Sequence, residues 1–155
     1  MRTPIFLRSY LPLAVAGLMF AALGAVAAAG EASVGDSGDV AIKGYDPVSY
    51  FVDHKAVRGS ESYSHRWLGA TWLFDSEGHR RMFAAAPASY APQYGGGCAE
   101  AMAETGAAVL DIDPESWQII DGKLYLSAEP HFQDRALDVA AADRNWQIAG
   151  AKLAH

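Results

Sequence analysis

The chain of 155 residues contains one cysteine and no excess of basic residues, and each scarcity excludes a class of protein. A lone cysteine excludes an intramolecular disulfide framework and any zinc site built from several cysteines of one chain. Twelve basic residues against 18 acidic ones give a net charge of −6, which argues against a nucleic-acid-binding domain with a basic surface. Hydrophobic residues make up 51% of the chain, so a disordered acidic protein is also excluded.

Long apolar runs are absent except at the amino terminus. There, Arg2 and Arg8 precede an uncharged stretch from Tyr10 to Ala29 that ends in small residues. A basic start, an apolar middle and an Ala-x-Ala end are typical of a secretory signal peptide, so residues 1–29 are predicted to be cleaved during export. The alternative is a retained membrane anchor, because about 20 apolar residues can span a bilayer. We expect a periplasmic or secreted protein with no other membrane contact.

The rest of the chain is predicted to form a short lead-in and one domain. Residues 30–40 are small, polar and rich in glycine and serine, which is typical of a flexible segment. No second linker and no repeat follows, so residues 41–148 are assigned to a single domain. The order of strand and helix patterns predicts a small α+β fold with antiparallel β-hairpins packed against about three helices.

The first predicted hairpin spans Tyr63–Asp75. A turn at Gly69-Ala70, with glycine first, would suit a two-residue loop. That turn pairs Trp67 with Trp72 and His65 with Phe74. Alternation with a period of two then places Tyr63 and these four side chains on one face, where they are expected to supply much of the core.

A second hairpin and three helices complete the predicted fold. The hairpin Ser116–Leu126 turns at Asp121-Gly122, a pair suited to a turn that needs positive φ at both residues. The helices are recognised from capping residues at their starts and from proline or glycine near their ends. They run from a cap at Ser76 to about Ala85, from the glycines at 95–97 to about Gly106, and from Pro130 to Trp146 or beyond.

Cys98 is the first candidate for chemistry. It follows three glycines and begins a predicted helix, where unpaired N–H groups and the helix dipole favour an anion such as a thiolate. Met102 lies four residues on, on the same helical face. Thiolate and thioether are soft donors that suit Cu(I). The alternative is that both side chains belong to the core, since cysteine and methionine are often buried.

His65 and His79 are the other candidate ligands. Two imidazoles, the Cys98 thiolate and the weaker thioether of Met102 would make a soft-metal site, with copper as the expected metal. Each histidine also has an explanation as a core residue. His65 lies on the aromatic strand face, and His79 precedes Met82 and Phe83 by one helical turn.

A thiol-dependent enzyme is a further alternative, with Cys98 as the nucleophile. His65 or His79 would be the base, and the carboxylate of Asp75 or Asp111 would orient it. No catalytic signature surrounds the cysteine, so this interpretation ranks after metal binding and after a structural or partner-binding role in which the thiol is inert.

Four motifs together resemble the exported YHS-domain family. They occur in order along nearly the whole domain, from about residue 41 to residue 146. The motifs are GYDPVSYF at 44–51, GATWLFDSEGHRRMF at 69–83, YAPQYGGGCA at 90–99 and DGKLYL at 121–126. The resemblance implies the fold of that family for this span but no defined activity.

The wider YHS group includes metal-associated modules of copper and heavy-metal transport, and the resemblance therefore implies a metal-binding role. Those modules resemble D-P-V-C-G and F-C-S-x-x-C-K, with cysteines where this chain has Ser49, Asp75 and His79. Cys98 matches instead the exported branch, whose pattern resembles G-G-Y-C-A, with Gly97 in place of the tyrosine. We therefore expect an exported module that binds copper around Cys98 without catalysis, and whose partner is a metal ion or a protein.

Overall fold

The computed structural model describes residues 40–153, and side chains are described for residues 40–150. The predicted signal peptide, the lead-in up to residue 39 and the signal cleavage site lie outside the described residues. The described part contains two antiparallel hairpins, five α-helices and three 3₁₀ turns, which confirms the predicted α+β fold. In chain order the elements are η1 (Ala41–Gly44), α1 (Ser49–Val52), β1 (Ser60–Trp67), β2 (Ala70–Phe74), α2 (Glu77–Ala85), α3 (Pro87–Tyr90), η2 (Gln93–Gly96), α4 (Ala99–Thr105), β3 (Asp113–Ile120), β4 (Lys123–Ser127), η3 (Phe132–Asp134) and α5 (Val139–Leu153).

The β1–β2 hairpin turns one residue earlier than predicted. Its loop is Leu68-Gly69, where both residues have positive φ, at 46° and 80°. The resulting pairs are Trp67 with Ala70 and His65 with Trp72, so the predicted turn and the predicted pairs were wrong. The chain places leucine rather than asparagine or aspartate at the first loop position, so the strongest local signal for this turn type was missing.

The aromatic face of this hairpin is nevertheless as predicted. The register differs by two residues, and side chains alternate with a period of two, so the slip leaves every side chain on its expected face. Trp72 and Phe74 are fully buried, while His65 and Trp67 are half-buried beside them. Phe83 of α2 packs against this face, with its ring centroid 4.9 Å from that of Trp72.

The β3–β4 hairpin turns at Asp121-Gly122, with φ values of 50° and 72°, as predicted. β4 is buried on both faces. Leu124 and Leu126 belong to the larger of two apolar clusters, together with the β1–β2 face and Phe83. Tyr125 belongs to the smaller one, which contains α4 and α5 side chains. β4 is therefore the shared wall between the two halves of the core.

Two of the three predicted helices end where expected, and α2 also begins at its predicted cap. α4 begins at Ala99, later than the predicted start at the glycines 95–97, because residues 93–96 form the turn η2. Ser76 caps α2, because its Oγ accepts the His79 N–H at 3.2 Å, and the helix ends at Ala85 before Pro87. α4 ends at Gly106, whose φ of 71° is the left-handed conformation common after a helix. The start of α2 is thus determined by a serine and the end of α4 by a glycine, each through residues close to it in the sequence.

The third helix begins at Val139, so its predicted start at Pro130 was wrong. Residues 131–135 form a turn instead, and the side-chain amide of Gln118 in β3 donates hydrogen bonds to the carbonyl groups of Phe132 and Arg135. Asp138 then caps α5 by accepting the Ala141 N–H at 2.9 Å. A contact from a distant strand therefore occupies carbonyl groups that a helix from Pro130 would have used.

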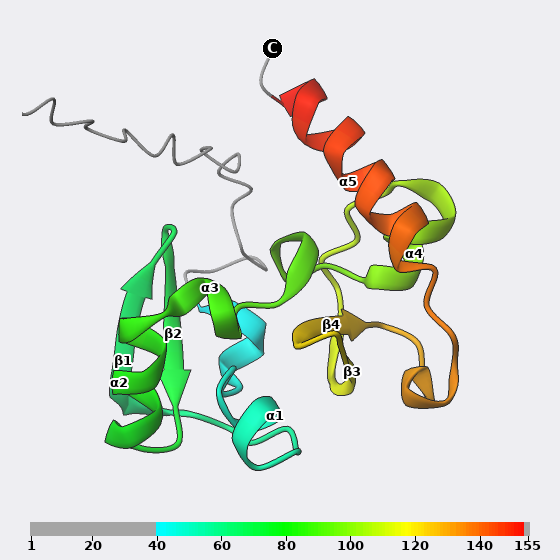
Figure 1. Cartoon of the computed structure of the whole chain (residues 1–155). Coiled ribbons are helices and arrows are strands. Elements are labelled where there is room, and N and C mark those ends of the chain that lie inside the picture. Colours follow the sequence, from blue (N-terminus) through cyan, green and yellow to red (C-terminus); the bar gives the residue numbers. More distant parts are fainter. Residues whose placement is uncertain (1–39, 154–155) are drawn as a thin grey trace, which may run out of the picture.

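Figure 1 shows how the halves are arranged. The β1–β2 hairpin lies on one side with α2 across it, whereas α4 and α5 pack together on the other side of β3–β4. Trp72 is buried as predicted, while Trp117 is half-buried against the ring of Tyr50. Within residues 40–153, no helix has the length and apolar character needed to cross a membrane.

Candidate functional site

Cys98 lies where β4 meets the start of α4. It is the residue that precedes α4, and its N–H donates to the Val109 carbonyl at 2.8 Å. It also pairs with Leu126 of β4 in an isolated parallel bridge. These backbone contacts leave the cysteine 4% exposed, within the larger apolar cluster. The thiol is thus at the predicted helix start but inside the core.

The thiol takes part in a hydrogen-bonded chain whose direction can be deduced. Cys98 Sγ lies 3.6 Å from Ser127 Oγ, which in turn lies 2.7 Å from Glu100 Oε2. A serine hydroxyl has one proton, and a carboxylate can only accept. Ser127 therefore donates to Glu100, so Cys98 must donate its S–H to Ser127. This arrangement uses the thiol in its protonated form.

Glu100 connects the hydrogen bonds of Cys98 and Ser127 to the protein surface. Its Oε1 accepts a hydrogen bond from Arg135 Nη1 at 2.9 Å, so both carboxylate oxygens act as acceptors. The Glu100 side chain is only 13% exposed, and that of Arg135 is about half exposed. The hydrogen bond with Glu100 raises the pKa of the Arg135 guanidinium. Sequence reasoning missed Glu100 and Ser127, because nothing local in the chain links them to Cys98.

Met102 does not share the surroundings of the thiol. Its N–H donates to the Cys98 carbonyl at 3.1 Å, as expected for successive turns of one helix. Its side chain is 1% exposed and packs in the smaller cluster with Tyr125 and Phe132, whereas Cys98 packs in the larger one. The two sulfur side chains therefore have separate roles in the core.

His79 is held by a buried carboxylate. Its Nδ1 lies 2.7 Å from Oδ2 of Asp46, which is fully buried. The same carboxylate accepts the N–H groups of Val48 and Asp75, each at 2.8 Å. Because a carboxylate only accepts, the imidazole carries its proton on Nδ1. Its Nε2 faces Asp53, with Oδ2 3.9 Å away.

Asp46 is a further residue that sequence reasoning missed. Its signal was local, since an aspartate can accept the backbone N–H of the residue two positions further on, as Asp46 does from Val48 just before α1. The bonds to Asp75 and His79 could not be read from the chain, because these residues lie 29 and 33 positions away.

His65 lies on β1, half-buried, with its ring edge-on to Phe83 at 6.0 Å between centroids. The structure thus places both histidines with the β1–β2 hairpin and α2, and it places Cys98 and Met102 at α4, on the other side in Figure 1. In the part of the chain that is described, no three His, Cys, Asp or Glu side chains gather as metal ligands would. Two carboxylates were suggested as orienting groups. The backbone N–H of Asp75 donates to Asp46, the carboxylate that also binds His79, and the Asp111 carboxylate pairs with Lys43 at 2.8 Å.

Comparisons with protein-family models, with curated proteins and with solved structures found no match. Membership of the exported YHS-domain family therefore stays a prediction that rests on the four motifs.

Proposed function

We propose that this domain binds a partner protein and that Cys98 is a buried structural residue rather than a metal ligand or a nucleophile. The observation that carries the proposal is the surroundings of the thiol. A ligand or nucleophile needs the thiolate and an open approach to sulfur. Cys98 meets neither requirement, because it is only 4% exposed and its S–H is the donor in a hydrogen bond to Ser127.

The alternative function is binding of a copper ion by Cys98, Met102, His65 and His79. A mononuclear site needs all its donors about 2.0–2.3 Å from one ion. The two histidines occupy β1 and α2, and each already has a partner in the core, Phe83 for His65 and Asp46 for His79. Assembling them with Cys98 would require the domain to rearrange around β4.

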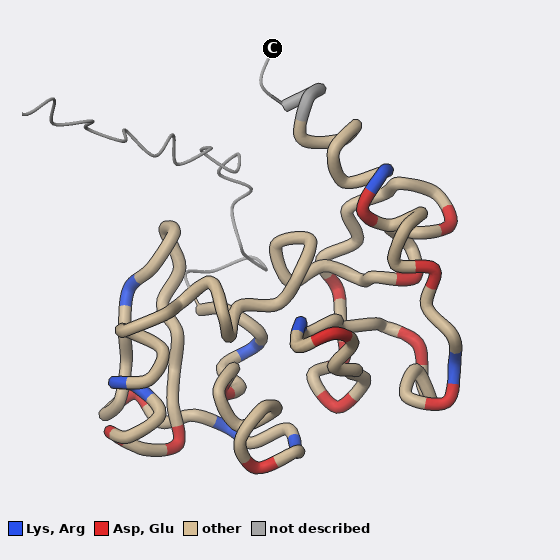
Figure 2. Tube along the Cα trace, in the orientation of Figure 1, with Lys and Arg blue, Asp and Glu red and all other residues tan. Residues whose placement is uncertain are grey.

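Binding of a partner is supported by the distribution of charge. Residues 99–155 contain ten acidic and four basic residues, whereas residues 40–98 contain five acidic and six basic ones. Figure 2 shows acidic positions along α4, at the β3–β4 turn and on the segments that lead into α5. A surface with an excess of one charge sign attracts partners of the opposite sign and speeds their encounter.

The proposal is tested by the reactivity of the thiol. We expect a neutral thiol reagent to label native Cys98 at pH 7 at least 100-fold more slowly than it labels the protein unfolded in guanidinium, because the buried thiol is out of reach. A Ser127→Ala variant, which removes the acceptor of the S–H, is the matched control for the hydrogen bond. Labelling at the unfolded rate in the native protein would contradict the proposal.

A titration with Cu(I) against a competing chelator supplies a second readout. We expect the wild-type protein and a Cys98→Ser variant to bind Cu(I) equally weakly. Stoichiometric binding that disappears in Cys98→Ser would establish the metal-binding alternative, whatever the labelling rate.

A further inference from the structure

A cleft of about 250 Å³ opens between α4 and the segment that leads into α5. Ala103, Leu137 and Ala141 form its apolar part, and all three are half-buried. Ala103 and Leu137 also pack against the smaller core cluster. The apolar part of the cleft is therefore continuous with the smaller core cluster.

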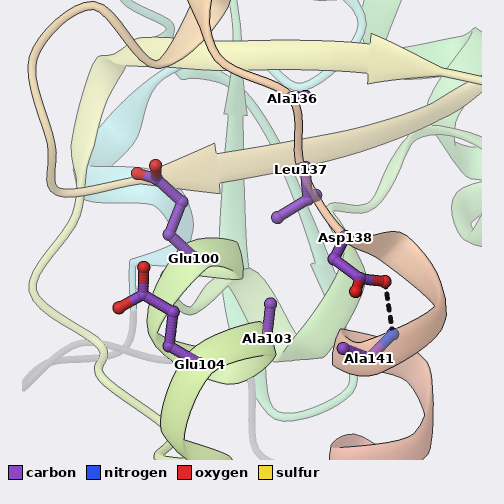
Figure 3. A pocket seen from close by; sticks show the side chains of 7 residues that line it. All are labelled: Glu100, Ala103, Glu104, Ala136, Leu137, Asp138 and Ala141. Carbon is purple, nitrogen blue, oxygen red and sulfur yellow. Dashed lines mark hydrogen bonds between the residues drawn. The ribbon is translucent and has the colours of Figure 1, made fainter.

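Two glutamates border this apolar surface. Glu100 and Glu104 are four residues apart on α4 and so lie on the same helical face, as Figure 3 shows. Leu137 points toward them from the opposite segment, while Asp138 turns away to bond Ala141 at the start of α5. Like charges four residues apart on a helix repel each other, so a cation bound here would relieve an unfavourable contact.

The neighbouring groups neutralise this pair only in part. Arg135 bonds Glu100 at 2.9 Å, and Ser127 occupies its other oxygen. Among the described residues Glu104 forms no ion pair. Glu129 is a further carboxylate close enough to act on Arg135. One guanidinium therefore faces three carboxylates, and the oxygens of Glu104 are free to accept.

We infer that this cleft docks a lysine side chain of a partner protein, with its alkyl stem on Leu137 and Ala103 and its ammonium group at Glu104 and Glu100. A lysine stem covers apolar surface while its charged end stays at a polar rim, which matches the two parts of the cleft. Each oxygen of Glu100 accepts one hydrogen bond and keeps a second lone pair, so a compact ammonium group can contact Glu104 and Glu100 together. The planar fork of an arginine pairs with a single carboxylate and suits this divided acceptor set less well. The acidic excess of the surrounding surface attracts such a partner.

The inference rests on the proposed partner-binding function and names the chemistry of the partner. The test follows the backbone amide signals of the ¹⁵N-labelled protein during titration with the peptide Ac-Gly-Ala-Lys-Ala-Gly-NH₂. We expect saturable shifts confined to amides around residues 100–104 and 136–141, and these shifts should weaken with added salt because the contact is between charges.

Two further peptides, in which Nε-acetyl-lysine or arginine replaces the lysine, and two protein variants complete the test. Replacing lysine with Nε-acetyl-lysine, or mutating Glu104→Gln, should weaken binding at least fivefold, since each removes one charge of the contact. Glu61→Gln, an equal change of charge on exposed β1, is the matched control and should leave binding unchanged. Absence of shifts with the lysine peptide, equal binding of the acetylated peptide, tighter binding of the arginine peptide, or an equal loss in Glu61→Gln would each overturn the inference. None of these results changes the labelling rate of Cys98, so the proposed function and this inference can fail separately.

Discussion

At the scale of single residues, Asp46 ties together three parts of the chain. Its buried carboxylate accepts from the backbone at the start of α1, from the backbone after β2 and from the side chain of His79 in α2. A buried charge is tolerated when it is fully hydrogen-bonded, and Asp46 meets this condition with three donors. This gives His79 a structural role that its sequence position alone did not reveal.

We predict that Asp46→Ala lowers the free energy of unfolding by about 3–5 kcal/mol, because it leaves buried donors without an acceptor. Urea unfolding followed by circular dichroism measures the change. Asp53→Ala is the control, since this carboxylate is 35% exposed and lies 3.9 Å from the other side of the same imidazole. Its loss should cost less than about 1 kcal/mol. Similar losses in the two variants would show that Asp46 does not have this role.

At the scale of elements, two glycines at the hairpins differ in what they tolerate. Gly122 in the β3–β4 turn has a φ of 72° and open space around it. Gly59, just before β1, has backbone against it, and an added Cβ would lie 2.4 Å from the carbonyl carbon of Leu73. The first glycine is required by its own conformation, and the second by the close approach of β2.

We therefore predict that Gly122→Ala costs about 1–2 kcal/mol, the strain of a left-handed alanine, and leaves the structure unchanged. Gly59→Ala should cost about 3 kcal/mol or more, because the clash is with backbone that cannot rotate away. Thermal unfolding of both variants, with near-ultraviolet circular dichroism to monitor packing of the tryptophans, tests the difference. The reverse order of stability would refute the account of Gly59.

At the scale of the whole molecule, β4 connects the two apolar clusters. Its side chains alternate between them, with Leu124 and Leu126 in the larger cluster and Tyr125 in the smaller one. A strand buried on both faces cannot lose one cluster and retain the other unchanged. The domain should therefore unfold as one cooperative unit.

We predict that Phe83→Ala in the larger cluster and Phe132→Ala in the smaller one each cost about 3–5 kcal/mol and shift one common transition. Both phenylalanines are fully buried. Far- and near-ultraviolet circular dichroism recorded on the same samples should give coincident curves. Two separate transitions in either variant would show that the clusters fold independently.

The sequence by itself determined the features that depend on residues close together in the chain. Asp121-Gly122 specified a turn, Ser76 and Gly106 marked helix ends, and alternation assigned the faces of the β1–β2 hairpin. These follow from the conformational preferences of a few adjacent residues, which act before any tertiary contact forms.

The tertiary structure alone decided the rest. The start of α5 depended on Gln118, which takes carbonyl groups 14 and 17 residues further along. The partners of the candidate ligands lay as far away, with Ser127 29 residues from Cys98 and Asp46 33 residues from His79. A single sequence shows that a thiol and two imidazoles are present but not which groups will satisfy them. That choice is made when the elements pack and each buried polar group takes the nearest available partner.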